Sequence, residues 1–200
     1  YIDDLISWAA IGARTTESQT HREMASGLSM PVGFKNSTDG SFVAAVNALK
    51  SSTSGHSFIG IDQNGNTSVL TTRGNPDGHI ISRGGSAGPN FHRKDLQNAV
   101  DLLEKARVPP AILVDCSHGN SGKKHVNQES VLHRLLADAI HDYSPIIGFM
   151  IESNLVEGHQ PILEDLTELQ YGVSITDECV GWEKTEHMLA YAYDTWGENR

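Results

Sequence analysis

Strand-like and helix-like segments alternate regularly along this chain, and few folds accommodate such an order. Short runs rich in apolar and β-branched residues, typical of buried strands, are followed by segments with apolar side chains at helical spacing. The strand candidates are Trp8–Ala13, Pro31–Lys35, Phe58–Ile61 with Val69–Thr72, His79–Arg83, Ile112–Cys116 and Ile146–Ile151. This alternation predicts an α/β fold built on a parallel sheet.

Three amphipathic segments between the strand candidates predict helices that cover the sheet. Their apolar stripes, which we assign to the core, are Phe42, Val46 and Leu49; Leu96, Val100 and Leu103; and Val131, Leu135 and Ala139. One pair of strand candidates breaks the alternation. Asn64-Gly65 between Phe58–Ile61 and Val69–Thr72 indicates a type I′ turn, so this pair is expected to form an inserted β-hairpin.

Composition excludes several classes of protein. A length of 200 residues predicts one domain with a sizeable core, and no apolar run is long enough to cross a membrane. The net charge of −10 argues against a nucleic-acid-binding surface. The first residues, Tyr1-Ile-Asp-Asp-Leu, are acidic where a signal peptide is basic, and the two cysteines, Cys116 and Cys179, form no disulfide framework. We therefore expect a cytoplasmic protein.

Ionisable side chains follow apolar runs at three places. His118 comes after the run that begins at Ala111, Glu152 comes after Ile146–Ile151, and Asp177 comes after Val173-Ser-Ile-Thr. In α/β barrels the carboxyl ends of the strands carry the reactive groups. A histidine and two carboxylates suit Mn, Fe, Zn or Co, so the three residues are candidate ligands of a divalent metal.

Cations follow three of the strand candidates. Arg14 lies in Gly12-Ala-Arg-Thr-Thr-Glu-Ser, whose backbone amides and hydroxyls precede a helix, and Lys35 and Arg83 end two further strands. If these strands are neighbours, the three cations converge and form a site for phosphate or carboxylate groups. A surface ion pair is the alternative for each cation alone.

Six motifs of the chain, in this order, resemble those of the class I 3-deoxy-D-arabino-heptulosonate-7-phosphate (DAHP) synthases. They are GARTTES, PVGFKNSTDG, GNPDGHIISRGG, DCSHGNSGK, GFMIESNLVEG and SITDECVGWE, and the resemblance extends from Asp4 to Trp182. It implies a (β/α)8 TIM barrel that condenses phosphoenolpyruvate with erythrose 4-phosphate and releases phosphate, the first step of the shikimate pathway.

The resemblance also implies roles for individual residues. The metal ligands would be His118, Glu152 and Asp177, and the phosphoenolpyruvate site would contain Ala13, through its amide, with Arg14, Lys35 and Arg83. Catalytic roles would belong to Lys35, His118 and Asp177.

The chain corresponds to only part of such a barrel. By the resemblance it begins at the fourth strand and supplies about the last five β/α units plus the hairpin, so that residues 1–200 are the C-terminal part of one catalytic domain. The family's fourth metal ligand, a cysteine after the first strand, and its Lys-Pro-Arg-Thr loop for the sugar phosphate are absent here. We read the chain as part of a longer protein and expect this part alone to be inactive. The alternative is that the chain is a half-barrel that needs a partner.

The inserted hairpin implies feedback regulation. In the resembling family an aromatic amino acid binds between this hairpin, a nearby loop and a neighbouring subunit, so a homo-oligomer, dimer or tetramer, is expected. The corresponding pocket residues are Gly27, Leu28, Ser29, Phe58, Gly60 and Leu70. Gly60 leaves room for a phenolic hydroxyl and therefore favours tyrosine as the effector. Alternatively, Gly60 only marks a bulge or a close approach of the backbone in a short strand, which is the more common meaning of a glycine in a strand.

Two other functions remain open from the sequence. A 3-deoxy-octulosonate 8-phosphate synthase would share the barrel and much of the anion site, although not the GARTTES and SITDECVGWE motifs. A catalytically inactive, anion-binding or regulatory half-barrel is the alternative from another class.

Overall fold

The computed structural model describes residues 5–140 and 145–197 of the chain. Its strands and helices alternate as the sequence predicts. In chain order they are β1 (Ala9–Ile11), α1 (Gln19–Ser26), β2 (Val32–Lys35), α2 (Val43–Ser52), β3 (Ser57–Ile61), β4 (Thr67–Thr71), β5 (Gly78–Ser82), α3 (Arg93–Lys105), β6 (Ile112–Asp115), α4 (Gln128–Ile140), β7 (Ile146–Met150) and α5 (Trp182–Gly197). Two short 3₁₀ helices, η2 (His125–Asn127) and η3 (Leu166–Glu168), lie in loops.

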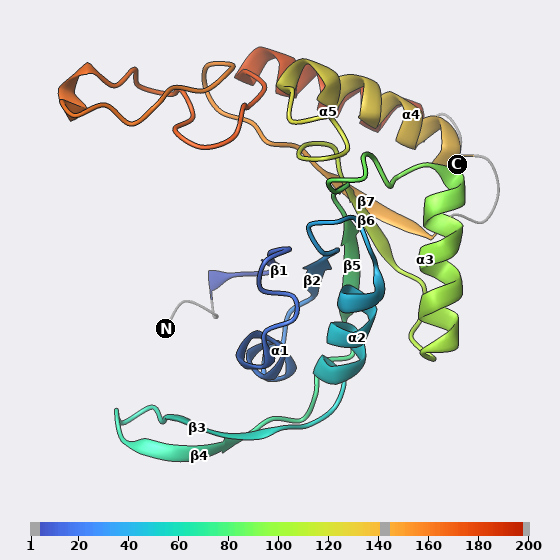
Figure 1. Ribbon diagram of the computed structural model, residues 1–200, viewed down its shortest axis with the longest axis vertical. Helices are drawn as coiled ribbons and strands as arrows, with labels where there is room; N and C mark the ends of the chain where they lie inside the picture. The colour runs from blue at the N-terminus through green and yellow to red at the C-terminus, as the bar shows by residue number, and fades with distance from the viewer. Residues whose placement is uncertain (1–4, 141–144, 198–200) are drawn as a thin grey trace.

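Five strands form one parallel sheet, in the order β1-β2-β5-β6-β7 within the described residues. The predicted α/β class and the predicted parallel sheet are confirmed. The helices follow one side of the curved sheet from α1 round to α5, and the opposite side is left uncovered (Figure 1). The carboxyl ends of parallel strands meet at one edge, so the residues that follow the five strands are placed side by side.

The core lies between the sheet and the helices. Its largest fully buried side chains include Phe34, Ile80 and Ile112 from the strands and Leu103 and Leu132 from the helices. The three predicted apolar stripes are confirmed, since all nine of their side chains are buried. Strands β2 and β5 are buried along nearly their whole length, so their sequences show no regular alternation of apolar and polar residues.

The inserted hairpin is confirmed, but its turn is not of type I′. β3 and β4 form a separate antiparallel sheet that connects α2 to the start of β5, at the amino-terminal end of that strand (Figure 1). A type I′ turn needs positive φ at two residues, whereas in this loop only Gly65 has one, of 83°. The Asp62 carboxylate accepts hydrogen bonds from the amides of Asn64 and Asn66, at 2.9 Å each. These bonds stabilise a longer, three-residue loop with glycine in the left-handed position.

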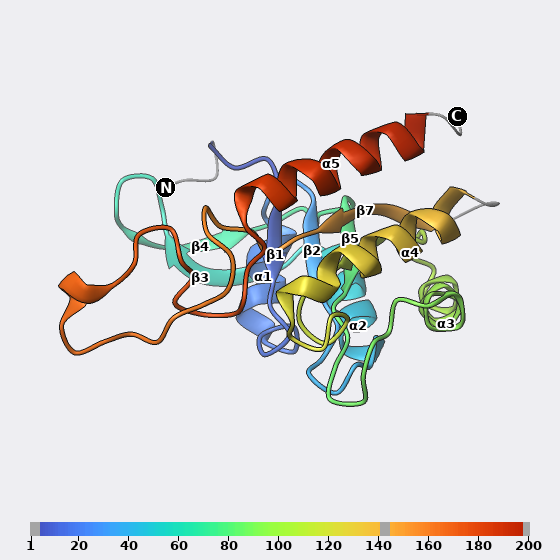
Figure 2. The same ribbon diagram turned by 90° about the horizontal axis from the view of Figure 1, so that it is seen from above.

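The expectation that a strand precedes Asp177 is wrong. Residues 173–176 form only an isolated bridge, between Ser174 and His159, within the loop that joins β7 to α5. Ile175 is 47% exposed, so the run is not the buried strand that its apolar residues suggest. This loop, residues 151–181, projects far from the sheet in both views (Figures 1 and 2). Among the described residues, no helix is long and apolar enough to span a membrane.

Candidate metal centre

The carboxyl edge of the sheet brings the predicted site residues into one row. Arg14 follows β1, Lys35 ends β2, Arg83 follows β5, His118 follows β6 and Glu152 follows β7, which is the order of the strands in the sheet. The expectation that the strands carrying the three cations are neighbours is therefore confirmed. Asp177 reaches the same edge from the long loop.

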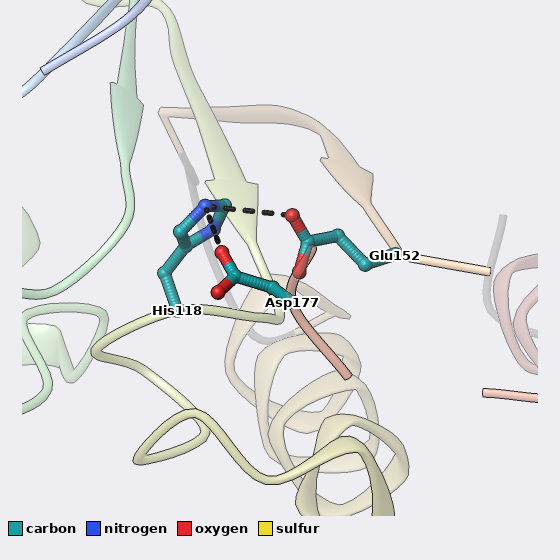
Figure 3. Close-up of side chains that lie close together, drawn as sticks. All are labelled: His118, Glu152 and Asp177. Carbon is teal, nitrogen blue, oxygen red and sulfur yellow. Dashed lines mark ion pairs between the residues drawn. The ribbon is translucent and has the colours of Figure 1, made fainter. Parts of the chain in front are cut away.

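His118, Glu152 and Asp177 converge on a common point (Figure 3). The Nε2 atom of His118 lies 3.4 Å from Glu152 Oε1 and 3.6 Å from Asp177 Oδ2. One ligand atom from each of the three residues lies within 4.8 Å of the other two. The hollow that they line, together with Lys123 and Glu178, has a volume of about 10 Å³, close to the space that one water molecule needs.

Hydrogen bonds on the other ring nitrogen fix the orientation of His118. Ser117 Oγ donates to Asp115 Oδ1 at 2.5 Å, so it accepts from His118 Nδ1, which lies 2.7 Å away. Nδ1 also lies 3.0 Å from Asp115 Oδ2. These partners require a proton on Nδ1, so that in the neutral form of the ring the lone pair of Nε2 faces the two carboxylates. His118 has a left-handed backbone with φ of 52°, an unfavourable conformation for a residue with a side chain.

Asp115 connects the histidine to the nearest cation of the row. Its carboxylate is buried and accepts a hydrogen bond from Lys35 Nζ at 2.8 Å. Burial alone would raise the pKa of Asp115, but the hydrogen bond from His118 and the positive charge of Lys35 hold this pKa well below its usual value. Asp115 is therefore a carboxylate near neutral pH.

Glu152 is positioned through its backbone. The side chain of Gln128, at the start of α4 and fully buried, accepts from Glu152 N at 2.9 Å and donates to Glu152 O at 3.2 Å. Burial raises the pKa of Glu152, His118 opposes this, and the charges of Asp115 and Asp177 raise the pKa further. Such a group gains from a nearby cation that stabilises its charged form.

Three buried asparagines join the loops that follow β2, β5 and β6. Asn36 Oδ1 accepts from Arg83 N at 2.7 Å, Asn90 Nδ2 donates to Gly40 O at 2.9 Å, and Asn120 Oδ1 accepts from Asn90 N at 2.9 Å. These loops approach so closely that a Cβ atom on Gly84, whose φ is 71°, would lie 2.5 Å from the backbone nitrogen of Asn120. The network fixes the backbone of Arg83.

The loop after β1 is held in a similar way. Thr16 is fully buried, and its hydroxyl contacts Gly12 O at 3.0 Å and Lys35 O at 2.7 Å. The backbone amides of Thr15 and Thr16 both donate to Gly12 O at 3.0 Å. Ala13 and Arg14 thus lie in a tight turn attached to the end of β2, with the Arg14 side chain exposed.

Comparison with known proteins decides the family. The sequence model of the DAHP synthetase I family matches residues 1–190. The chain belongs to the DAHP synthetase I family. The resemblance inferred from the six motifs is confirmed.

Individual relatives of this DAHP synthetase I chain are longer than the chain itself. The Tyr-sensitive phospho-2-dehydro-3-deoxyheptonate aldolase of Escherichia coli K12 is 52% identical over 189 residues, which are 94% of this chain and 53% of the relative. The Trp-sensitive enzyme of the same organism is 50% identical over 198 residues, with 98% and 56% covered. The solved structure of the Francisella tularensis SCHU S4 aldolase has a TM-score of 0.93 and 46% identity, and covers 99% of this chain and 57% of that structure. The chain thus spans about half the length of the curated relatives that it matches.

The two cysteines of this DAHP synthetase I chain are poor metal ligands as they stand. Cys116 is buried, and burial raises the pKa of its thiol well above the usual range. Burial also raises the pKa of Cys179, whose Sγ lies 3.6 Å from Asp177 O. Neither forms a disulfide, in agreement with the prediction.

The residues expected to bind a feedback effector lie in the loop after α1 and on one face of the hairpin. Gly27 abuts Thr72, because a Cβ there would lie 2.9 Å from Thr72 Cγ2, and Ser26 Oγ contacts Thr72 Oγ1 at 2.7 Å. Leu28 is partly buried against the core, and Ser29 is exposed. The loop at the end of α1 and the hairpin are therefore neighbours.

Gly60 marks a close approach and not a bulge. It pairs with Ser68 in unbroken register, and Phe58 pairs with Leu70. A Cβ on Gly60 would overlap the end of the Leu70 side chain and would lie 3.7 Å from Phe58 Cε2. Space for a larger group at Gly60 thus depends on the rotamer of Leu70.

Four residues that support the site were not assigned a role from the sequence. They are Asp115, Ser117, Gln128 and Glu178. Asp115 and Ser117 stand directly before His118, so their position beside a candidate ligand was an available signal. Gln128 and Glu178 act on residues 24 and 53 positions away, and no local pattern indicates those contacts.

Proposed function

We propose that the complete protein containing this chain is a DAHP synthase. It condenses phosphoenolpyruvate with D-erythrose 4-phosphate and releases phosphate, at the entry to the shikimate pathway and chorismate biosynthesis. The observation that carries this proposal is the convergence of His118, Glu152 and Asp177 beside a row of three cations, in a chain of the DAHP synthetase I family.

The donor set fits a divalent metal. Nε2 of His118 and the two carboxylates of Glu152 and Asp177 present lone pairs to one another across 3.4 and 3.6 Å, an arrangement that a cation between them neutralises. One imidazole and two carboxylates suit Mn, Fe, Zn or Co. Asp115 and Ser117 are the outer partners that orient a metal-bound histidine. We therefore propose His118, Glu152 and Asp177 as metal ligands.

The chain's own residues bind and orient the substrates in this proposal. Arg14, Lys35 and Arg83 hold the phosphate and carboxylate of phosphoenolpyruvate by charge-assisted hydrogen bonds, with the amide of Ala13 as a further donor. Asp115 accepts a hydrogen bond from Lys35 Nζ and so holds this side chain at the carboxyl edge of the sheet. A bound divalent metal supplies Lewis-acid polarisation of the aldehyde oxygen of erythrose 4-phosphate. The fixed positions of the cations hold the nucleophilic carbon of phosphoenolpyruvate towards that aldehyde.

The five-stranded sheet forms part of a (β/α)8 barrel in this proposal, and residues 1–200 belong to one catalytic domain. Strands β1 and β7 are the two edges of the described sheet, and an exposed sheet edge favours pairing with a further strand. Beside β7, side chains of α4, β7 and α5 line an apolar groove of about 330 Å³. Ile147 and Trp196 in this groove are 58% and 40% exposed, which supports their coverage by the remainder of the barrel.

Regulation by tyrosine in a cytoplasmic homo-oligomer completes the proposal. The pocket would contain Gly27, Leu28, Ser29, Phe58, Gly60 and Leu70, and the proximity of the hairpin to the loop after α1 supports this assignment. On the opposite face of the hairpin Ile59, Ile61 and Val69 are 77, 65 and 72% exposed. An exposed apolar face of this kind supports contact with a second subunit, in a dimer or tetramer.

Replacement of His118 in the full-length protein tests the function. We expect His118→Ala to abolish most DAHP formation and to weaken binding of Mn²⁺ to the metal-stripped protein, since a ligand is lost. His187→Ala, on the exposed surface of α5, is the control and should change neither quantity. Full turnover of the metal-stripped wild-type enzyme in the presence of a chelator would contradict the proposal.

A further inference from the structure

The loop that carries Asp177 is long and lies mostly outside the body of the protein. Residues 151–181 contain no helix or strand among the described elements except η3 (Leu166–Glu168), and they extend away from the sheet (Figure 2). Long loops without regular structure are usually functional or poorly ordered. A metal ligand near the end of such a loop needs contacts that hold it in place.

Backbone hydrogen bonds fasten the base of this loop at the residues that follow Asp177, and Gln160 N donates to Ser174 O at 2.7 Å on the other side of Asp177. Val180 N donates to Glu152 O at 2.9 Å, Asn154 N donates to Val180 O at 2.9 Å, and Cys179 exchanges hydrogen bonds of 3.0 and 2.9 Å with Gly158. The Asp177 side chain itself is 54% exposed, compared with 16% for His118 and 31% for Glu152. Asp177 is thus the least enclosed of the three candidate ligands.

Glu178 supplies a contact across to the loop that carries His118. Its Oε1 accepts from Lys124 Nζ at 3.0 Å, and its Oε2 accepts from the backbone nitrogen of His125 at 3.2 Å and lies 3.0 Å from His125 Nδ1. The Glu178 side chain is only 17% exposed. Lys124 and His125 follow His118 in the loop after β6, so the three contacts join the two loops beside the candidate metal centre.

We propose that Glu178 is a positioning residue, which fixes Asp177 relative to His118 by clamping the Asp177 loop to Lys124 and His125. This inference rests on the proposed metal centre, and it names the residue that holds the ligands of that centre in position. Both oxygens of Glu178 accept hydrogen bonds from the loop after β6, so this side chain joins the two loops that carry Asp177 and His118. Hydrogen bonds to a charged acceptor are among the stronger ones in proteins, and three of them restrict the positions that the adjacent Asp177 can adopt. A site held in its binding geometry in advance loses less entropy when the metal binds.

Metal binding by the full-length, metal-stripped protein tests this inference. Glu178→Gln keeps the size of the side chain but turns an amide NH₂ towards donors of Lys124 or His125, so at least one contact is lost. We expect Co²⁺ to bind this variant about 10–100-fold more weakly, with an altered visible absorption spectrum, as is typical when an outer partner of a metal ligand is removed. Glu164→Gln, which changes an exposed glutamate of the same loop, is the matched control and should leave the Co²⁺ affinity and the absorption spectrum unchanged.

Two further variants separate the possible outcomes. Asp177→Asn, titrated in the same way, reports whether Asp177 is a ligand at all. If Asp177→Asn weakens Co²⁺ binding and Glu178→Gln does not, the clamp is refuted and the metal centre stands. If neither Asp177→Asn nor His118→Ala changes Co²⁺ binding, the metal centre fails and the clamp fails with it.

Lys124→Met tests the clamp without a risk to folding, because the Lys124 side chain is 63% exposed. We expect a smaller loss of Co²⁺ affinity than for Glu178→Gln. Because both changes break the same contact, their effects should be less than additive in the double variant. Full additivity, or a lower melting temperature of the metal-free Glu178→Gln protein with unchanged Co²⁺ affinity, would overturn the positioning role.

Discussion

Replacing Asp115 by asparagine removes one negative charge from the centre of the site while nearly preserving the shape of the side chain. In the wild-type structure the Asp115 carboxylate is 2% exposed and contacts Lys35 Nζ, His118 Nδ1 and Ser117 Oγ at 2.8, 3.0 and 2.5 Å. Lys35 is 14% exposed, so the substitution leaves a largely buried ammonium without its partner. Breaking a buried ion pair on one side costs about 3–5 kcal/mol.

This cost should appear in thermal unfolding of the full-length protein. The relatives are about twice as long as this chain, and for a domain of that size 1 kcal/mol corresponds to roughly 1–2 °C, so the melting temperature of Asp115→Asn should fall by about 3–10 °C. Mn²⁺ affinity should fall by about 10–100-fold, because His118 loses an outer partner. Asp138→Asn is the matched control. It breaks the Arg134–Asp138 pair of 3.0 Å on the surface of α4, where the arginine is 62% exposed, and should cost only about 0.3–0.5 kcal/mol.

The pH dependence of unfolding provides an independent check. The pKa of Asp115 is lowered by folding, so its contribution to stability is fully present above the ordinary aspartate value of 3.8 and is lost as the pH falls below it towards the folded-state pKa. The stability difference between the wild type and Asp115→Asn should therefore be constant near neutral pH and shrink in strong acid. Equal melting temperatures for Asp115→Asn and Asp138→Asn at pH 7 would refute the reasoning.

Three other substitutions in the full-length protein test separate parts of the proposed function. Lys35→Met should raise the KM for phosphoenolpyruvate by roughly tenfold or more, since a hydrogen bond between charged groups is worth about 1.5–3 kcal/mol; an unchanged KM would contradict the assignment. Gly60→Ser should shift inhibition from tyrosine towards phenylalanine by about tenfold, provided that the Leu70 side chain rotates away. If phenylalanine inhibits the wild type more strongly than tyrosine does, Gly60 does not select the effector. Gln128→Met should destabilise the fold by about 1–3 kcal/mol in chemical denaturation, because the backbone amide of Glu152 loses its acceptor, and it should also weaken Mn²⁺ binding. Gln97→Met, at an exposed position of α3, is the control and should change neither stability nor Mn²⁺ binding.

Local sequence patterns predicted the elements of the fold because those patterns reflect burial. Val32–Lys35 and Ile112–Asp115 are largely apolar because these central strands pack into the core beneath the helices, and Leu96, Val100 and Leu103 recur at the period of a helix that packs on one side. The same patterns placed Lys35, His118 and Glu152 at strand ends, where the structure finds them. The turn at Asn64-Gly65 was predicted less well, since the Asp62 side chain outside the dipeptide decides its conformation.

Tertiary structure alone decided which of these residues meet. Lys35 and Asp115 are 80 positions apart in the sequence, and Glu178 and His125 are 53 apart, so no periodicity relates them. Asp177 follows an apolar run that does not become a strand, and it reaches His118 because the base of its loop is hydrogen-bonded to Glu152 and lies against the loop after β6. Parallel strands place their carboxyl ends at one edge whatever their separation in sequence. Strand order and loop contacts therefore convert strand-end residues, which the sequence identifies one by one, into a single site.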